Sequence, residues 1–204
     1  EKCDDILHRQ VYLGQGRQEG LLVYVEVAVS NLMLEEHVIG LSDVQPLKSY
    51  EEGKAALLAG NGLLFLDGDT NCYKISSKGY PGLGVKKAEN EKVIRGSQEA
   101  FTESEKINVA LIRKRLRDSR MKVEEQTVGV RSHTMTALVY MEDLIYQGLL
   151  TTMKQQLQRY EIDGILDSGM LEQLSEKHWL SPFPQFQTTE RPDRAAAAVL
   201  EGRI

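Results

Sequence analysis

The chain has 204 residues, of which 41% are hydrophobic and 27% charged, and its net charge is −5 at pH 7. This composition is close to that of ordinary folded domains, so it predicts a packed core and excludes a largely disordered chain. The acidic balance disfavours nucleic-acid binding, and no apolar stretch approaches the roughly 20 residues of a membrane-spanning helix.

The N-terminal ten residues, EKCDDILHRQ, are polar and acidic, which is unlike a secretory signal peptide. They also lack an initiating methionine, which indicates a fragment of a longer protein. Cys3 and Cys72 are too few for a disulfide framework, so we expect free thiols in a reducing compartment.

The first half of the chain predicts the order strand, strand, helix, helix, strand, strand. Residues 21–29, LLVYVEVAV, indicate a buried strand, and RQVYLGQG before them is its expected hairpin partner. A second helix begins at Ser49, because Glu52 three residues later completes a capping box, and it ends at Gly60. The other expected elements are a first helix over 31–41 and two short strands around DGD within 62–75.

Residues 76–92 are rich in glycine, lysine and glutamate, which is typical of an exposed loop. We therefore expect a linker at residues 79–92, which separates an N-terminal subdomain, 1–78, from a second subdomain, 93–204. The second subdomain begins with a helix whose predicted capping box is Thr102 and Glu105.

The rest of the second subdomain predicts two strands followed by three helices. Asp167 or Ser168 is the expected cap of the middle helix, and Pro192 and Gly202 mark the start and end of the last one. The predicted segments are strands at 121–130 and 134–142, helices at 148–160, 168–178 and 191–202, and an extended stretch at 181–187.

Two segments of the first half recur in the second. LLVYVE (21–26) matches ALVYME (137–142), and LLAGNG (57–62) matches VLEGRI (199–204). The two matches are 116 and 142 residues apart, so the second unit carries an insertion of about 26 residues. The repeat predicts an α/β fold of two related subdomains, with small mixed sheets flanked by helices. The second subdomain is expected to be truncated at its C-terminal hairpin.

The sequence contains no pattern that predicts a catalytic, cofactor or metal site. GQGRQEG (14–20) leads into a strand, whereas a dinucleotide loop leads out of one, so we interpret it as a hairpin turn. The four histidines lack metal-ligand spacing, and no nucleophile elbow accompanies Ser168. We therefore expect a protein that is not an enzyme.

Charged clusters are the remaining candidates for function. RKRLRDSRMK (113–122) is a solvated helix face or a contact with an acidic partner, and TTERPDRAAAAVLEG (188–202) is a helix start or an interface. VIRGSQEAFTES (93–104) has no glycine series before its helix, so it predicts a joint between the subdomains instead of a phosphate loop. The candidate contact or hinge residues are Arg95, Glu99, Arg113, Arg115, Arg131, Glu190, Arg191 and Asp193.

Several long blocks resemble GerA-type spore germination proteins, the A subunits of nutrient germinant receptors. The blocks are VIRGSQEAFTES…INVALIRKRL, KVEEQTVGVRSHTMTALVYME, EIDGILDSGMLEQL and SPFPQFQTTERPDRAAAAVLEGR. Three positions of the first block, Ser97, Gln98 and Ala100, depart from the family's usual proline, basic residue and glycine. Met170 stands where a tyrosine is common.

The resemblance implies that this chain is the hydrophilic N-terminal domain of a longer protein with transmembrane helices after it. The receptor would lie in the spore inner membrane with B and C subunits, and this domain would face the spore core, the cytoplasmic side. A subunits are expected to assemble into an oligomeric ion channel, with no cofactor and no nucleic acid. The alternatives are a germinant-binding module with a cleft between the subdomains, or the same domain of the SpoVAF accessory paralogue.

Overall fold

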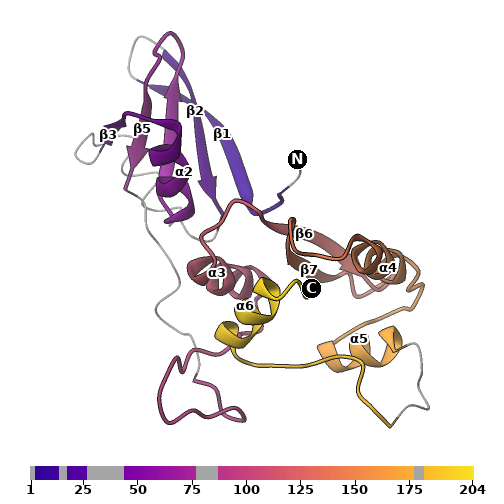
Figure 1. Cartoon of the computed structure of the whole chain (residues 1–204). Coiled ribbons are helices and arrows are strands. Elements are labelled where there is room, and N and C mark those ends of the chain that lie inside the picture. The colour runs from indigo at the N-terminus through magenta and orange to yellow at the C-terminus, as the bar shows by residue number, and fades with distance from the viewer. Residues whose placement is uncertain (1–2, 14–17, 27–43, 77–86, 177–181) are drawn as a thin grey trace.

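The computed structural model describes residues 3–13, 18–26, 44–76, 87–176 and 182–204. The helix predicted over 31–41 and most of the predicted 79–92 linker lie outside these residues. The described chain forms two lobes, each built around its own sheet (Figure 1).

The first lobe is a five-stranded sheet in the order β1-β2-β4-β5-β3. Each neighbouring pair is antiparallel, and so is the pair in the second lobe, which corrects the mixed sheets that we expected. Short connections explain this for the pairs β1–β2, β4–β5 and β6–β7, because a parallel pair needs a crossover of a dozen or more residues. The strands are β1 (Ile6–Leu13), β2 (Gln18–Val25), β3 (Val44–Leu47), β4 (Gly62–Leu66) and β5 (Cys72–Ile75).

Helix α2 (Tyr50–Leu58) follows the predicted capping chemistry. The Ser49 side chain accepts a hydrogen bond from the Glu52 N–H at 3.2 Å, and the Glu52 carboxylate accepts from the Lys48 N–H at 2.9 Å. Gly60 ends the helix with a φ of +84°. Strand β3 was not predicted, because Pro46 weakens a strand pattern; proline is accommodated here since β3 is the outermost strand.

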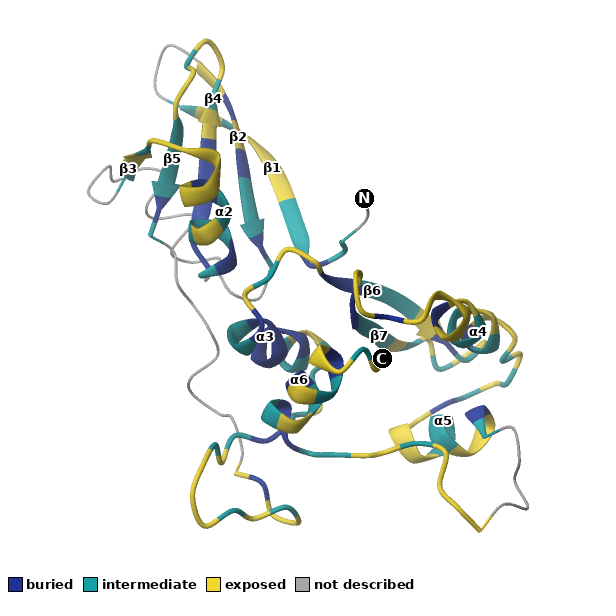
Figure 2. Cartoon of the chain, viewed as in Figure 1, coloured by how far each residue is buried: buried dark blue, intermediate teal, exposed yellow. Residues whose placement is uncertain are grey.

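The second lobe is a two-stranded sheet of β6 (Met121–Val128) and β7 (Thr134–Met141), covered by helices on both faces. Helices α3 (Glu105–Arg115) and α6 (Pro192–Leu200) bury the odd-numbered face, where Met121, Val123 and Met141 meet Val109 and Val199. Helix α4 (Gln147–Gln158) lies against the other face (Figures 1 and 2).

The side chain of Tyr140 packs with Leu150 of α4, and Val128 packs with Leu157 of α4. Helix α5 (Ser168–Ser175) begins beyond α4, and the Asp167 carboxylate caps it by accepting from the Met170 N–H at 2.7 Å. Between the two caps that we considered, the structure therefore selects Asp167.

The predicted capping box of α3 is wrong. Ser104 is the N-cap residue and makes no side-chain cap bond. The Thr102 hydroxyl instead accepts from the Ser104 N–H at 3.2 Å, while the Thr102 N–H donates to the Asn108 side chain at 2.7 Å. The local turn occupies the hydroxyl, so it cannot reach the helix. Phe101 packs against the core cluster to which α3 contributes.

Candidate functional site

Residues 87–100 form a loop that is fastened to the second lobe, and we call it the clamped loop. Lys87 and Glu99 form an isolated β-bridge, and the Ala88 N–H donates to the Gln98 carbonyl at 3.0 Å. The Phe101 N–H, just after the loop, donates to the Glu190 carbonyl at 2.8 Å. The first residues of the clamped loop belong to the predicted 79–92 linker, and they lie bound to the second lobe.

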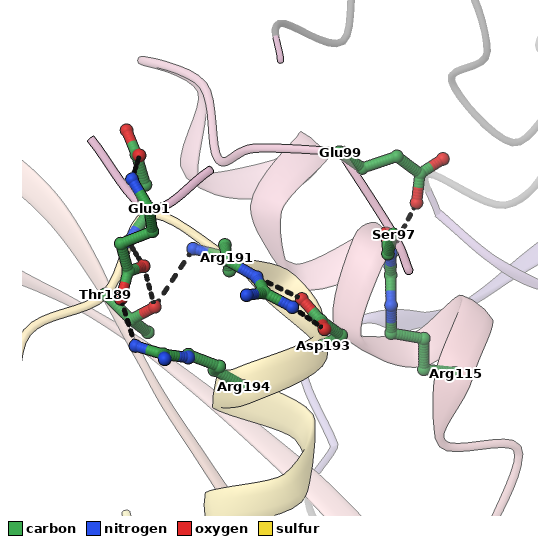
Figure 3. A network of polar contacts seen from close by, with 9 residues as sticks. Glu91, Ser97, Glu99, Arg115, Thr189, Arg191, Asp193 and Arg194 are labelled. Carbon is green, nitrogen blue, oxygen red and sulfur yellow. Dashed lines mark hydrogen bonds and ion pairs between the residues drawn. The ribbon is translucent and has the colours of Figure 1, made fainter. Parts of the chain in front are cut away.

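Two glutamates fasten the start of the clamped loop to the N-terminus of α6. The Glu190 carboxylate accepts from the N–H groups of Asn90 and Glu91 at 2.6 and 2.5 Å, and the Glu91 carboxylate accepts from the Glu190 N–H at 3.0 Å. Glu91 also accepts from the Thr189 hydroxyl and from Arg194 (Figure 3). The Thr189 hydrogen bond, together with the nearby Arg194, lowers the pKa of Glu91.

Glu99 fastens the end of the clamped loop to α3. Its carboxylate lies 2.8 Å from Lys114 Nζ. It also lies 2.5 Å from Arg115 Nη2, and Arg115 donates to the Ser97 hydroxyl at 2.9 Å (Figure 3). The hydrogen bond from Lys114 is the main cause that lowers the pKa of Glu99.

We expect Glu99→Gln to destabilise the chain at pH 7 by about 1 kcal/mol, because it removes a partly exposed carboxylate shared by two cations. Because folding lowers the pKa of Glu99, its stabilisation is complete above the unfolded value of about 4.3. It is lost as the pH falls through the folded value. Urea denaturation at several pH values should therefore show the two proteins converging in acid.

Glu103→Gln is the matched control for this change, because Glu103 is exposed and forms no hydrogen bond or ion pair with the described residues. We expect this control to track the wild type at every pH. A Glu99→Gln deficit that persists unchanged at pH 3 would contradict an ionic clamp.

Arg191 and Asp193 form a separate, local pair at the start of α6. Arg191 Nε and Nη2 lie 3.1 and 2.5 Å from the two oxygens of Asp193, and the Arg191 N–H donates to the Thr189 hydroxyl at 3.1 Å. The hydrogen bond from Arg191 lowers the pKa of Asp193. The shared Thr189 places this pair beside the Glu91 contacts (Figure 3).

Arg113 is buried where the two lobes meet. Its side chain is 1% exposed, and Nε and Nη2 donate to the two carboxylate oxygens of Asp5 at 2.8 Å each. Its Nη1 donates to the Met121 carbonyl at 3.2 Å. Asp5 comes just before β1, so this ion pair joins the first lobe to α3. Lys106 and Glu26, 2.6 Å apart, form a second and more exposed link between the lobes.

Two other candidates lie apart from these contacts. Arg131 pairs with Asp163 at 3.3 Å, and both side chains are exposed. Arg95 is exposed at the tip of the clamped loop and forms no ion pair within the described chain. The structure thus brings together Glu99 with Arg115 and Arg191 with Asp193, while the Glu190 carboxylate binds the clamped loop. The remaining three candidates take no part in these contacts.

Sequence reasoning missed Asp5 and Glu91, which organise the contacts above. Each is one acidic residue among 30, and its partner is about a hundred positions away in the sequence. Neither residue belongs to a motif, so no signal in a single sequence could have identified it.

The described residues contain no group of three side chains that could hold a metal ion. Within the same residues, each helix is too short or too polar to cross a membrane. A mostly apolar cavity of about 430 Å³ lies under α2, lined by residues such as Leu47, Gly53, Leu57 and Phe65. Ser119 alone among its lining residues comes from the second lobe, so this cavity belongs mainly to the first lobe.

A family model described as Bacillus/Clostridium GerA spore germination protein matches residues 26–204. The uncharacterized membrane protein YfkQ of Bacillus subtilis is 32% identical, with 100% of this chain and 44% of that protein aligned. Spore germination protein KA of B. subtilis is 33% identical, over 83% of this chain and 31% of that protein. Stage V sporulation protein AF of B. subtilis is 32% identical, over 80% and 33%.

The fold is similar to a crystal structure of the N-terminal domain of the A subunit of the Bacillus megaterium spore germinant receptor GerK3. The TM-score is 0.72 at 24% identity, and the match covers 98% of this chain and 82% of that one. This likeness confirms the α/β fold. The chain spans less than half the length of the curated relatives that it matches.

Proposed function

Because the chain belongs to the GerA family of spore germination proteins, we propose that it is the N-terminal domain of a germinant receptor A subunit. In this proposal the domain gathers A subunits and passes a conformational signal to a membrane part, and it catalyses no reaction. The full receptor would include B and C subunits in the spore inner membrane, with this domain on the core side. The family resemblance of the sequence blocks and the arrangement of α3 support this proposal.

Three consecutive residues of α3 contact two different parts of the chain, and this observation carries the signalling role. Arg113 holds Asp5 of the first lobe, while Lys114 and Arg115 hold Glu99 of the clamped loop. A displacement of the loop therefore pulls on the same helical turn that anchors the first lobe. Closely packed elements transmit such shifts as rigid bodies.

The tip of the clamped loop is the proposed contact with a neighbouring A subunit. Ile94 is 100% exposed, and Arg95 beside it is exposed as well. A single exposed apolar residue is common on protein surfaces. Here the loop is fastened at both ends, so the loop would lose little conformational entropy when a partner binds its tip. Arginine is also enriched at protein interfaces.

A photocrosslinking residue at position 94 of the full-length protein in spores tests this contact. We expect crosslinks between A subunits through position 94, and none through position 12, where Tyr12 is an exposed residue on β1. We also expect Ile94→Asp to slow nutrient-triggered germination several-fold while changing the unfolding free energy by less than about 0.5 kcal/mol. Spores that germinate normally, with no crosslink at position 94, would overturn the assembly role.

Two alternatives keep specific support. The identity with stage V sporulation protein AF fits the same domain in an accessory paralogue, and complementation of spores lacking either gene separates these assignments. Germinant binding would use the cavity under α2 instead of the expected cleft between the subdomains, because this cavity of about 430 Å³ lies mainly in the first lobe and falls within the range of small-ligand pockets. Calorimetry with germinant amino acids, sugars and nucleosides tests it, and the absence of both heat and thermal shift would leave the scaffold role ahead.

A further inference from the structure

Helices α2 and α6 end in the same way, which gives the internal repeat a structural basis. The C-cap residues, which follow the last helical residues, have nearly identical backbone dihedral angles: Ala59 has φ −83° and ψ 1°, and Glu201 has φ −84° and ψ 4°. Gly60 and Gly202 come next, with φ of +84° and +81°. Both helix ends are therefore built alike, with a glycine in the left-handed region.

The backbone hydrogen bonds of the two ends also correspond. Asn61 N–H donates to the Ala56 carbonyl, and Arg203 N–H donates to the Ala198 carbonyl, both at 3.1 Å. The glycine N–H groups donate three residues back at 2.9 and 3.1 Å. Each end is thus a Schellman motif, and it directs the next residues in the same way relative to its helix. In the first lobe, the chain leaves this motif at Gly62, which begins β4.

Strand β4 then pairs with the edge of β2 that faces away from β1. The Asp67 N–H donates to the Glu19 carbonyl at 2.8 Å, in register with the β2–β4 ladder. Because hydrogen-bonded residues alternate along an antiparallel ladder, the backbone groups of Glu19, Leu21 and Val23 point to β4. Strand β2 is therefore paired on both edges, with β1 on the other side.

Strand β7, the counterpart of β2, is paired within the described residues only on the edge that faces β6. The Glu142 N–H donates to the Arg120 carbonyl at 2.9 Å in register with this ladder, so even-numbered residues of β7 point to β6. The backbone groups of Met135, Ala137 and Val139 point the other way and find no backbone partner in the described chain. These three residues correspond, through the 116-residue repeat, to the three residues of β2 that bind β4.

We propose that the open edge of β7 receives an antiparallel strand that continues the chain directly from Ile204. This inference rests on the proposed function, in which the chain is part of a longer protein. The register is taken from the first lobe, where Leu63 and Phe65 lie opposite Val23 and Leu21. The first residue after Ile204 then lies opposite Val139 and the third opposite Ala137.

This register would place Ile204 opposite Tyr140. Ile204 corresponds to Gly62, and it packs against the cluster that contains Tyr140, the counterpart of Tyr24. A strand from a second copy could also pair with this edge. The chain's own strand is favoured because it begins at the edge, which gives it a high effective concentration. The second lobe would then connect to the rest of the longer protein through this added strand. A displacement of the strand would therefore move β7 and α6 together.

Amide hydrogen exchange measured by NMR tests the proposal. The chain of 204 residues is compared with a chain that is ten natural residues longer. We expect the longer chain to protect the N–H groups of Met135, Ala137 and Val139 at least tenfold more. Ala137→Pro should abolish the gain at Met135 and Val139, while it is tolerated in the shorter chain, because the lost N–H faces the open edge.

The outcomes separate the two proposals. If the reading frame ends at Ile204, the proposed function fails. If the chain continues but these amides exchange as fast as before, the strand proposal fails alone. Protection that appears in the shorter chain and rises with its concentration, with a dimer in sedimentation, would assign the edge to a second copy and overturn the proposal.

Discussion

Arg113→Met is expected to destabilise the chain by about 3–5 kcal/mol, because it leaves the carboxylate of Asp5 buried without its partner. The two side chains are 1% and 5% exposed, so water cannot replace the lost hydrogen bonds. Methionine preserves much of the packing volume, so the loss reports mainly on the ion pair. Urea denaturation followed by circular dichroism measures the change.

Two further variants show whether the buried charge is the cause. Arg120→Met removes an arginine whose side chain is 57% exposed, and its pairs with Asp118 and Asp143 lie at the surface. We expect it to cost less than about 1 kcal/mol. The double variant Asp5→Leu with Arg113→Met should recover most of the loss, because neither charge is then left unpaired. An Arg113→Met deficit no larger than that of Arg120→Met would contradict a buried ion pair between the lobes.

The ion pair also links stability to the proposed signalling role. In spores, the double variant is expected to restore the amount of folded receptor but not the normal germination response, because the charged link between β1 and α3 stays absent. Immunoblotting of the receptor alongside germination kinetics separates these effects. Normal germination of the double variant would show that packing alone is enough to couple the lobes.

Local chemistry explains which elements the sequence predicts correctly. Ser49 with Glu52 and Asp167 with Met170 place a side-chain acceptor within reach of the helix N–H groups, and these contacts depend on neighbouring residues only. The strand pairs β1–β2, β4–β5 and β6–β7 are hairpins, so their register is set by short connections.

The errors arise where a competing local contact or a distant residue decides the outcome. Thr102 and Glu105 match the sequence pattern of a capping box, but the Thr102 N–H donates to the Asn108 side chain and the helix begins only at Glu105. Asp5 finds Arg113 only because the first residues run along β6, where the Asp4 N–H donates to the Val123 carbonyl at 3.1 Å. A single sequence contains no record of such proximity.

Gly202→Ala is expected to cost about 2–5 kcal/mol, because it adds both backbone strain and a steric contact. Gly202 has a φ of +81°, where an L residue with a Cβ is disfavoured by about 1–2 kcal/mol. A Cβ at this position would also lie 2.7 Å from the Leu144 carbonyl oxygen. This oxygen belongs to the backbone, so a side-chain rotation cannot relieve the contact, and the overpacking adds about 1–3 kcal/mol.

Gly68→Ala is the matched control, because Gly68 has a φ of +79° but a Cβ there would meet no atom within 4 Å. It should therefore show the conformational cost alone, about 1–2 kcal/mol, and the difference between the two variants measures the contact with Leu144. Thermal and urea unfolding supply both values, and equal losses would show that the chain near Leu144 moves freely. Gly202 precedes Ile204, which packs against the cluster of Tyr140. If the proposed strand forms, the longer Gly202→Ala chain should therefore also lose the protection of Val139, whereas Gly68→Ala should keep it.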